Sequence, residues 1–339
     1  MALTNQNIIT ATGLQDILFQ RIKEKIPSQT PIVDIVSEIL HVSIDSAYRR
    51  IRGETLLVMD EVAELCRHFN LSMDQLLGTK NNDVLFHNVH IRDGELTYRQ
   101  YLEGLTAHMT ALSEVEQKEV IYMSKDLPIF HNFYFRPLIA FRYFFWMKTH
   151  LMHPDFEKIQ FNFNILPGDI EILSHELVRT YCSVPSAEMW NTESINSTIS
   201  QIEFSRDSGH FSSAADLKSV YDALEESVLH MKLQAERGCK FMPGEEPEAK
   251  KSNFKFFFNR VVLGDNTIMV VANGVKSVFI NYGHLNYMET SDENFCNELY
   301  KDFENLIRRS TQISQTSEKQ RNIFFNILLE KIKDRKHNL

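Results

Sequence analysis

Apolar residues recur at intervals of three and four between residues 14 and 78, and this spacing predicts amphipathic helices. Polar turns divide the region into five short helices. The second begins at Pro31 with Thr30 as its N-cap, because a proline at the first helical position lacks only an N–H that would have no partner there. The pattern therefore predicts an all-helical domain over residues 1–80.

The third of these helices, SIDSAYRRIR, spans residues 43–52 and carries most of the local charge. The hydroxyl of Ser43 can cap its first turn, and Gly53 can close it in the left-handed conformation. At 100° per residue the helix divides into an apolar inner side, Ile44, Ala47, Tyr48 and Ile51, and a polar outer side, Asp45, Ser46, Arg49 and Arg50. We expect the polar side to face outward.

After a polar linker over residues 81–95, residues 96–339 mix helical and strand patterns. Helical spacing returns over residues 96–112, 168–181, 194–206, 214–238, 291–308 and 318–334, and strand patterns over residues 120–130, 254–263, 267–272 and 275–283. The pair Asn273-Gly274 between the last two strands is a strong hairpin signal. The expected fold is mainly α with a smaller β part, a five-helix domain followed by a larger α+β regulatory or dimerisation domain.

The segment over residues 131–151, HNFYFRPLIAFRYFFWMKTHL, is dense in aromatic residues. Such density is typical of a core or a dimer interface. The alternative is a pocket whose rings surround an effector, with Arg136 or Arg142 facing an anionic group. We expect such a cavity to lie between residues 133–146 and the sheet over residues 254–283, and its effector to be a small molecule or a peptide.

Composition narrows the class of protein. The net charge of −9 means that any contact with nucleic acid must come from a local patch. The four cysteines lie far apart, which predicts reduced thiols rather than a disulfide framework. Neither a secretory signal nor about 20 uninterrupted apolar residues for a membrane span are found, so we expect a cytoplasmic protein.

The run over residues 31–78 resembles the helix-turn-helix domain of lambda-repressor-like, XRE-type transcription regulators, down to its ending NLSMDQLLG. Its inter-helix turn, often a glycine in that family, contains His41. The resemblance implies a five-helix fold and double-stranded DNA as a partner. It also implies a recognition helix over residues 43–52 whose first turn faces base edges. The candidate DNA-binding residues are Thr30, Ser43, Asp45, Ser46, Arg49, Arg50 and Arg52.

The C-terminal run SVFINYGHLNYMETSDENFCNELYKDFENLIRRSTQIS is similar to part of the phospholipase-D-like sensor regions of some prokaryotic regulators. The catalytic His-x-Lys-x4-Asp pattern of that superfamily is not met, because Arg237 stands where the aspartate is needed. The resemblance therefore implies a sensory or scaffolding role rather than phosphodiester chemistry.

The sequence contains no GxxxxGK[ST], GxSxG or HExxH motif, and its histidine pairs lack partners for a metal, so we predict neither an enzyme nor a cofactor. Residues 1–80 hold eight Lys or Arg against ten Asp or Glu. A domain with that balance binds DNA weakly as a single copy, which favours a homodimer. Two alternatives remain open: a protein-interaction adaptor that uses the helical N-terminus, and an unrecognised hydrolase.

Overall fold

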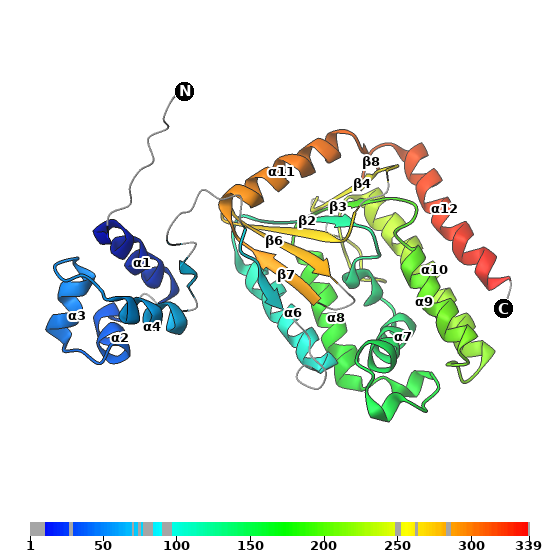
Figure 1. The fold of residues 1–339 in the computed structure, drawn as a ribbon. Coiled ribbons are helices and arrows are strands. Elements are labelled where there is room, and N and C mark those ends of the chain that lie inside the picture. Colours follow the sequence, from blue (N-terminus) through cyan, green and yellow to red (C-terminus); the bar gives the residue numbers. More distant parts are fainter. Residues whose placement is uncertain are drawn as a thin grey trace, which may run out of the picture. The chain divides into compact units, whose positions relative to one another are not determined.

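The computed structural model describes residues 11–26, 30–69, 71–73, 76, 84–89, 97–247, 252–261, 264–282 and 286–337. The chain divides into two compact units, Met1–Leu85 and Phe86–Leu339 (Figure 1). Each unit has its own hydrophobic core, because the buried apolar side chains of the two units form separate clusters.

The N-terminal unit contains helices α1 (Ala11–Lys25), α2 (Ile32–Ile39), α3 (Ile44–Ile51) and α4 (Met59–Phe69). Met73 and Leu76 are also helical, but the rest of the predicted fifth helix lies outside the described residues. The four helices bury one apolar residue or more from each: Leu18, Ile22, Val36, Ala47 and Leu65. This shared core holds the short helices together, since none is long enough to be stable alone.

The two predicted helix starts in this unit have different outcomes. Ser43 is the N-cap of α3, and its hydroxyl accepts a hydrogen bond from the Ser46 N–H at 3.3 Å. Thr30 is not the N-cap of α2; that position is taken by Pro31, whose backbone is extended (φ −67°, ψ 118°), so the helix begins one residue later than predicted. His41 adopts a positive φ of 52°, the conformation that favours glycine in such a turn.

In the part of the C-terminal unit that the structure describes, eight strands form one mixed sheet in the order β1-β7-β6-β5-β2-β3-β4-β8. The β2–β3 and β3–β4 pairs are parallel and the other pairs are antiparallel. The strands are β1 (His87–Val89), β2 (Lys118–Ser124), β3 (Ser186–Trp190), β4 (Phe254–Phe258), β5 (Thr267–Ala272), β6 (Val275–Tyr282), β7 (Asn286–Thr290) and β8 (Thr311–Gln312).

The β5–β6 hairpin confirms the signal of its two turn residues. Asn273 and Gly274 have φ of 48° and 85°, as a type I′ turn requires. Three strands were not predicted from the sequence: β3, β7 and the two-residue β8. The edge strand β1 also departs from expectation, since it lies within the segment assigned to the linker and pairs with β7.

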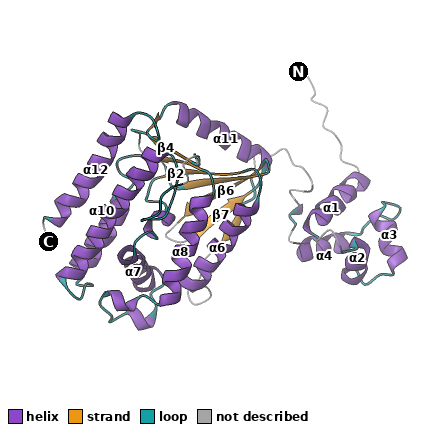
Figure 2. Ribbon diagram, turned by 180° about the vertical axis from the view of Figure 1, so that it is seen from behind, coloured by secondary structure: helices purple, strands orange, loops and turns teal. Residues whose placement is uncertain are grey.

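Helices cover both faces of the sheet (Figures 1 and 2). One face packs against α11 through a core that includes Ile121, Met189 and Phe303. The other packs against a larger core formed with the remaining helices. The helices of this unit are α6 (Tyr98–Glu114), α7 (Arg136–Phe145), α8 (Gly168–Ser183), α9 (Asn196–Asp207), α10 (Ala214–Arg237), α11 (Glu293–Arg308) and α12 (Glu318–Lys336).

The chain is thus a mixed α/β protein in which helix predominates. Among the described residues, no helix combines the length and apolar character that crossing a membrane requires.

Candidate functional site

The face of α3 that points to solvent differs from the predicted one. Ala47 is fully buried, whereas Ile44 is 53% and Tyr48 44% exposed. The exposed face comprises Ile44, Asp45, Tyr48, Arg49 and Arg52, and the buried side is centred on Ala47 and Ile51. The prediction that Ile44 and Tyr48 pack inward is therefore wrong, because α3 is rotated about its axis relative to the expected phase.

This rotation turns Arg50 toward α4. Its Nη2 lies 2.7 Å from Glu61 Oε1, its Nε lies 3.1 Å from both Glu61 oxygens, and both side chains are 16% exposed. These hydrogen bonds from Arg50 lower the pKa of Glu61, against the opposing effect of burial, and the Val58 N–H adds to the lowering. The expectation that Arg50 lies on the exposed face is wrong. Its guanidinium instead joins α3 to α4.

Gln15 of α1 holds the segment that joins α3 to α4. Its side chain is buried, its Nε2 donates to the carbonyls of Arg50 (2.6 Å) and Thr55 (2.9 Å), and its Oε1 accepts from the Leu57 N–H (2.8 Å). One amide therefore satisfies three backbone groups of the segment between α3 and α4. Contacts with α1, through Gln15, and with α4, through Glu61, therefore hold α3 in place with its exposed face toward solvent.

The other cations of α3 have only exposed partners. Arg49 pairs with Asp45 at 3.0 Å, and Arg52 with Glu54 at 3.6 Å, all with side chains at least half exposed. The Arg52 guanidinium also lies 5.5 Å from the centre of the Tyr48 ring. Exposed ion pairs of this kind contribute little stability, so both arginines can exchange their partner for a phosphate at small cost.

The remaining predicted DNA contacts lie at the helix ends. Thr30 is exposed just before α2. Ser43 and Ser46 join their hydroxyls at the start of α3, with the two Oγ atoms 3.0 Å apart. Five apolar side chains on α3 and between α3 and the start of α4 are also exposed: Ile44, Tyr48, Leu56, Val58 and Met59.

The two arginines expected to bind an effector do not form one site. They are six residues apart on α7 and lie on different sides of it. The Arg136 Nε donates to Glu171 Oε2 at 3.1 Å at the surface. Arg142 is buried and donates to Gln201 Oε1 (2.5 Å) and Asn132 Oδ1 (2.8 Å), and burial lowers its pKa to about 10.

The aromatic segment is packed rather than hollow. Phe133, Phe141 and Phe144 are essentially without exposure and belong to the same core as Phe254 and Phe256 of β4. The core interpretation of this segment is therefore confirmed.

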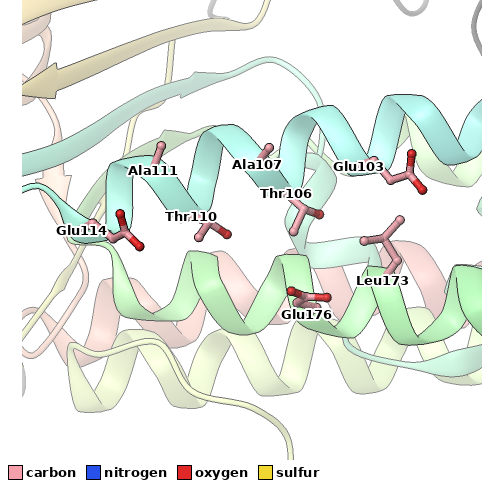
Figure 3. A pocket seen from close by; sticks show the side chains of 8 residues that line it. All are labelled: Glu103, Thr106, Ala107, Thr110, Ala111, Glu114, Leu173 and Glu176. Atoms are coloured by element: carbon pink, nitrogen blue, oxygen red, sulfur yellow. The ribbon is translucent and has the colours of Figure 1, made fainter. Parts of the chain in front are cut away.

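The described part of this unit has hollows in other places. A shallow groove of about 500 Å³ runs between α6 and α8, with Glu103 and Glu114 at its ends and Leu173 and Glu176 on the α8 side (Figure 3). A second hollow, of about 250 Å³, adjoins the end of α8 and the segment after α10, where its lining includes Cys182 and Lys240. Neither was anticipated from the sequence.

A buried polar network, also unpredicted, surrounds Glu188 in β3. His131 Nε2 lies 2.9 Å from Glu188 Oε2, and the Trp190 Nε1–H and the Tyr181 hydroxyl also donate to this carboxylate. Burial would raise the pKa of Glu188, but His131, the charge of Lys240 and the Tyr181 hydroxyl hold it below its ordinary value. The Lys240 Nζ lies 3.6 Å from the centre of the Tyr181 ring. In the sequence, Glu188 stands in the stretch VPSAEMW, which has no motif that would mark such a network.

The α3 face and the Glu188 network differ in accessibility. The Asp45 and Arg49 side chains of α3 are open to solvent, whereas Glu188 and His131 are fully buried and can contact no ligand without rearrangement. The α3 face is therefore the stronger candidate for a binding site. In comparisons with protein-family models, curated proteins and solved structures, the chain matches none of them.

Proposed function

We propose that this protein is a sequence-specific transcription regulator of the cytoplasm, in which the N-terminal unit binds double-stranded DNA through α3. The observation that carries the proposal is α3 itself. It is the second of two helices joined by a tight turn, and it presents an open N-terminal end with two exchangeable arginines. In a helix-turn-helix protein this helix enters the major groove while its predecessor crosses the backbone.

The residues of α3 divide into two roles in this proposal. Arg49 and Arg52 contact DNA, because their present ion pairs are exposed. Arg50 holds α3 against α4 through Glu61 and is a positioning residue. Asp45, next to Arg49, can accept a hydrogen bond from a cytosine amino group at a base edge.

The larger unit would supply dimerisation and the response to a small-molecule or peptide effector. Support for a dimer comes from charge, because the first 80 residues hold more acidic than basic side chains. Two linked copies gain affinity that one copy with this balance lacks. Of the two hollows, the one beside Cys182 and Lys240 is the more enclosed candidate for an effector.

The test is selection of a duplex from a random pool by the full chain, followed by affinity measurements. We expect Arg49→Ala to weaken binding of the selected duplex by about ten-fold, because one charge-assisted contact is lost. Arg21→Ala is the matched control, since Arg21 is an exposed, ion-paired arginine that belongs to α1 and not to α3. Failure to select any duplex, or equal affinity of the Arg49 and Arg21 variants, would contradict the proposal.

A second candidate function is an adaptor that binds another protein through the N-terminal unit. The observation that favours it is that several apolar side chains on and just after α3 are exposed, namely Ile44, Tyr48, Leu56, Val58 and Met59, since exposed apolar surface is a feature of protein interaction sites. The same duplex selection separates the candidates. An adaptor yields no duplex, and its partner affinity depends on Val58 and Met59 rather than on Arg49.

A further inference from the structure

The first turn of α3 has an apolar edge that the core does not use. Ile44 is the first helical residue after the Ser43 cap, and its side chain is 53% exposed. Tyr48 follows one turn later, 40° around the helix axis from Ile44, and is exposed as well. An exposed β-branched residue contributes nothing to helix propensity at this position. The edge therefore has no evident role in the stability of the unit.

The place of this edge matches the place where a recognition helix reads DNA. In a docked helix-turn-helix motif, the N-terminal residues of the second helix contact base edges in the major groove. There thymine presents a C5 methyl group, and an apolar side chain is its natural partner. Arginine is the side chain that most often reads guanine. Arg50 is not available for this role, because its guanidinium is hydrogen-bonded to Glu61.

We propose that Ile44, flanked by Tyr48, reads thymine methyl groups, so that the operator carries a thymine in each half-site opposite the start of α3. This inference rests on the proposed DNA-binding function and adds the class of base that the helix selects. The Arg52 guanidinium lies 5.5 Å from the centre of the Tyr48 ring, and at helical spacing Arg52 follows Tyr48 on the same side as Ile44. The selection is made by an apolar contact, and the arginines supply affinity.

The experiment removes only the methyl group. Each thymine of the selected operator is replaced in turn by deoxyuridine, and the affinity of the full chain is measured for every duplex. At the thymine in question we expect a loss of about four-fold, the order that burial of one methyl group confers. In Ile44→Ala the same replacement should change affinity by less than 1.5-fold, roughly the scatter of such measurements, because the apolar partner is gone.

Two further variants make the result specific. Ile44→Val keeps a branched apolar group and should retain the sensitivity to the methyl, whereas Ile172→Ala, which truncates an exposed isoleucine of α8, should leave it unchanged. An unaltered thermal midpoint of Ile44→Ala shows that the variant is folded.

The outcomes separate this inference from the proposed function. If the chain selects a duplex but no deoxyuridine replacement weakens binding, or if Ile44→Ala remains as sensitive as the parent chain, methyl reading by Ile44 is refuted while DNA binding stands. If no duplex is selected, the proposed function fails and the inference falls with it.

Discussion

At the scale of single residues, Arg50 and Arg49 show how neighbours on one helix take different tasks. Arg49 has an exposed partner one turn away, and Arg50 has a largely buried partner on another helix. An exposed pair at i, i+4 contributes about 0.3 to 0.5 kcal/mol, whereas a charged hydrogen-bonded pair removed from water contributes more when it is intact. Position relative to α4 decides which arginine is structural.

We expect Glu61→Gln to destabilise α3 and α4 by about 1 to 2 kcal/mol at pH 7, because the charged acceptor of three hydrogen bonds from Arg50 and one from the Val58 N–H becomes neutral. The pKa of Glu61 in the folded chain lies below its ordinary value of 4.5. Its contribution is therefore complete above pH 4.5 and is lost as the pH falls through the lowered pKa. Hydrogen exchange of α3 and α4 amides in the full chain measures this. Asp45→Asn is the control, with an expected effect under about 0.5 kcal/mol, and an equal effect of both variants would contradict the prediction.

At the scale of elements, two glycines differ in whether their backbone conformation would accept a side chain. Gly274 ends the β5–β6 turn at φ 85°, a conformation that disfavours a side chain. Gly104 lies within helix α6, where an added Cβ would meet no atom within 4 Å. The turn needs its glycine and the helix does not.

We therefore predict opposite signs for the same substitution. Gly274→Ala should lower the stability of the C-terminal unit by about 1 kcal/mol, because φ must stay positive. Gly104→Ala should raise it by about 0.5 to 1 kcal/mol through helix propensity. Thermal unfolding of the two variants beside the parent chain tests both, and a shift of the same sign in both would show that backbone conformation does not decide the outcome.

Sequence patterns predicted the long elements better than the short ones. The apolar residues of α6, α8, α10 and α12 repeat at helical spacing over several turns. The β5–β6 hairpin is recognisable because an Asn-Gly pair favours the positive φ angles of its turn. In contrast, β3 is five buried residues with a glutamate in the middle, and β8 has only two residues, so neither has a readable alternation.

The candidate site was predicted only in part for a related reason. Helix α3 has eight residues, too few for apolar spacing to fix its rotation. In the structure Arg50 of this helix is hydrogen-bonded to Glu61, eleven residues further along the chain, and such a contact leaves no periodic trace in the sequence.

At the scale of the whole molecule, each unit has a complete core, so assembly must use surface residues. We predict that the full chain is a dimer at tens of micromolar, because the N-terminal unit is too acidic to bind DNA tightly as one copy. Light scattering over a concentration series is the measurement. A mass that stays at 39.6 kDa throughout would rule the dimer out.

The buried carboxylate of Glu188 also constrains the order in which the larger unit can fold. A charge of this kind is costly to bury alone, so β3 can enter the sheet only when His131 and Tyr181 arrive with it. The partner histidine is 57 residues earlier in the chain, and β3 pairs in parallel with both β2 and β4. Contacts so distant in sequence form slowly. Amides of β3 should therefore be among the last to gain protection during refolding, and early protection in pulse-labelled hydrogen exchange would show that the carboxylate is buried before its partners are in place.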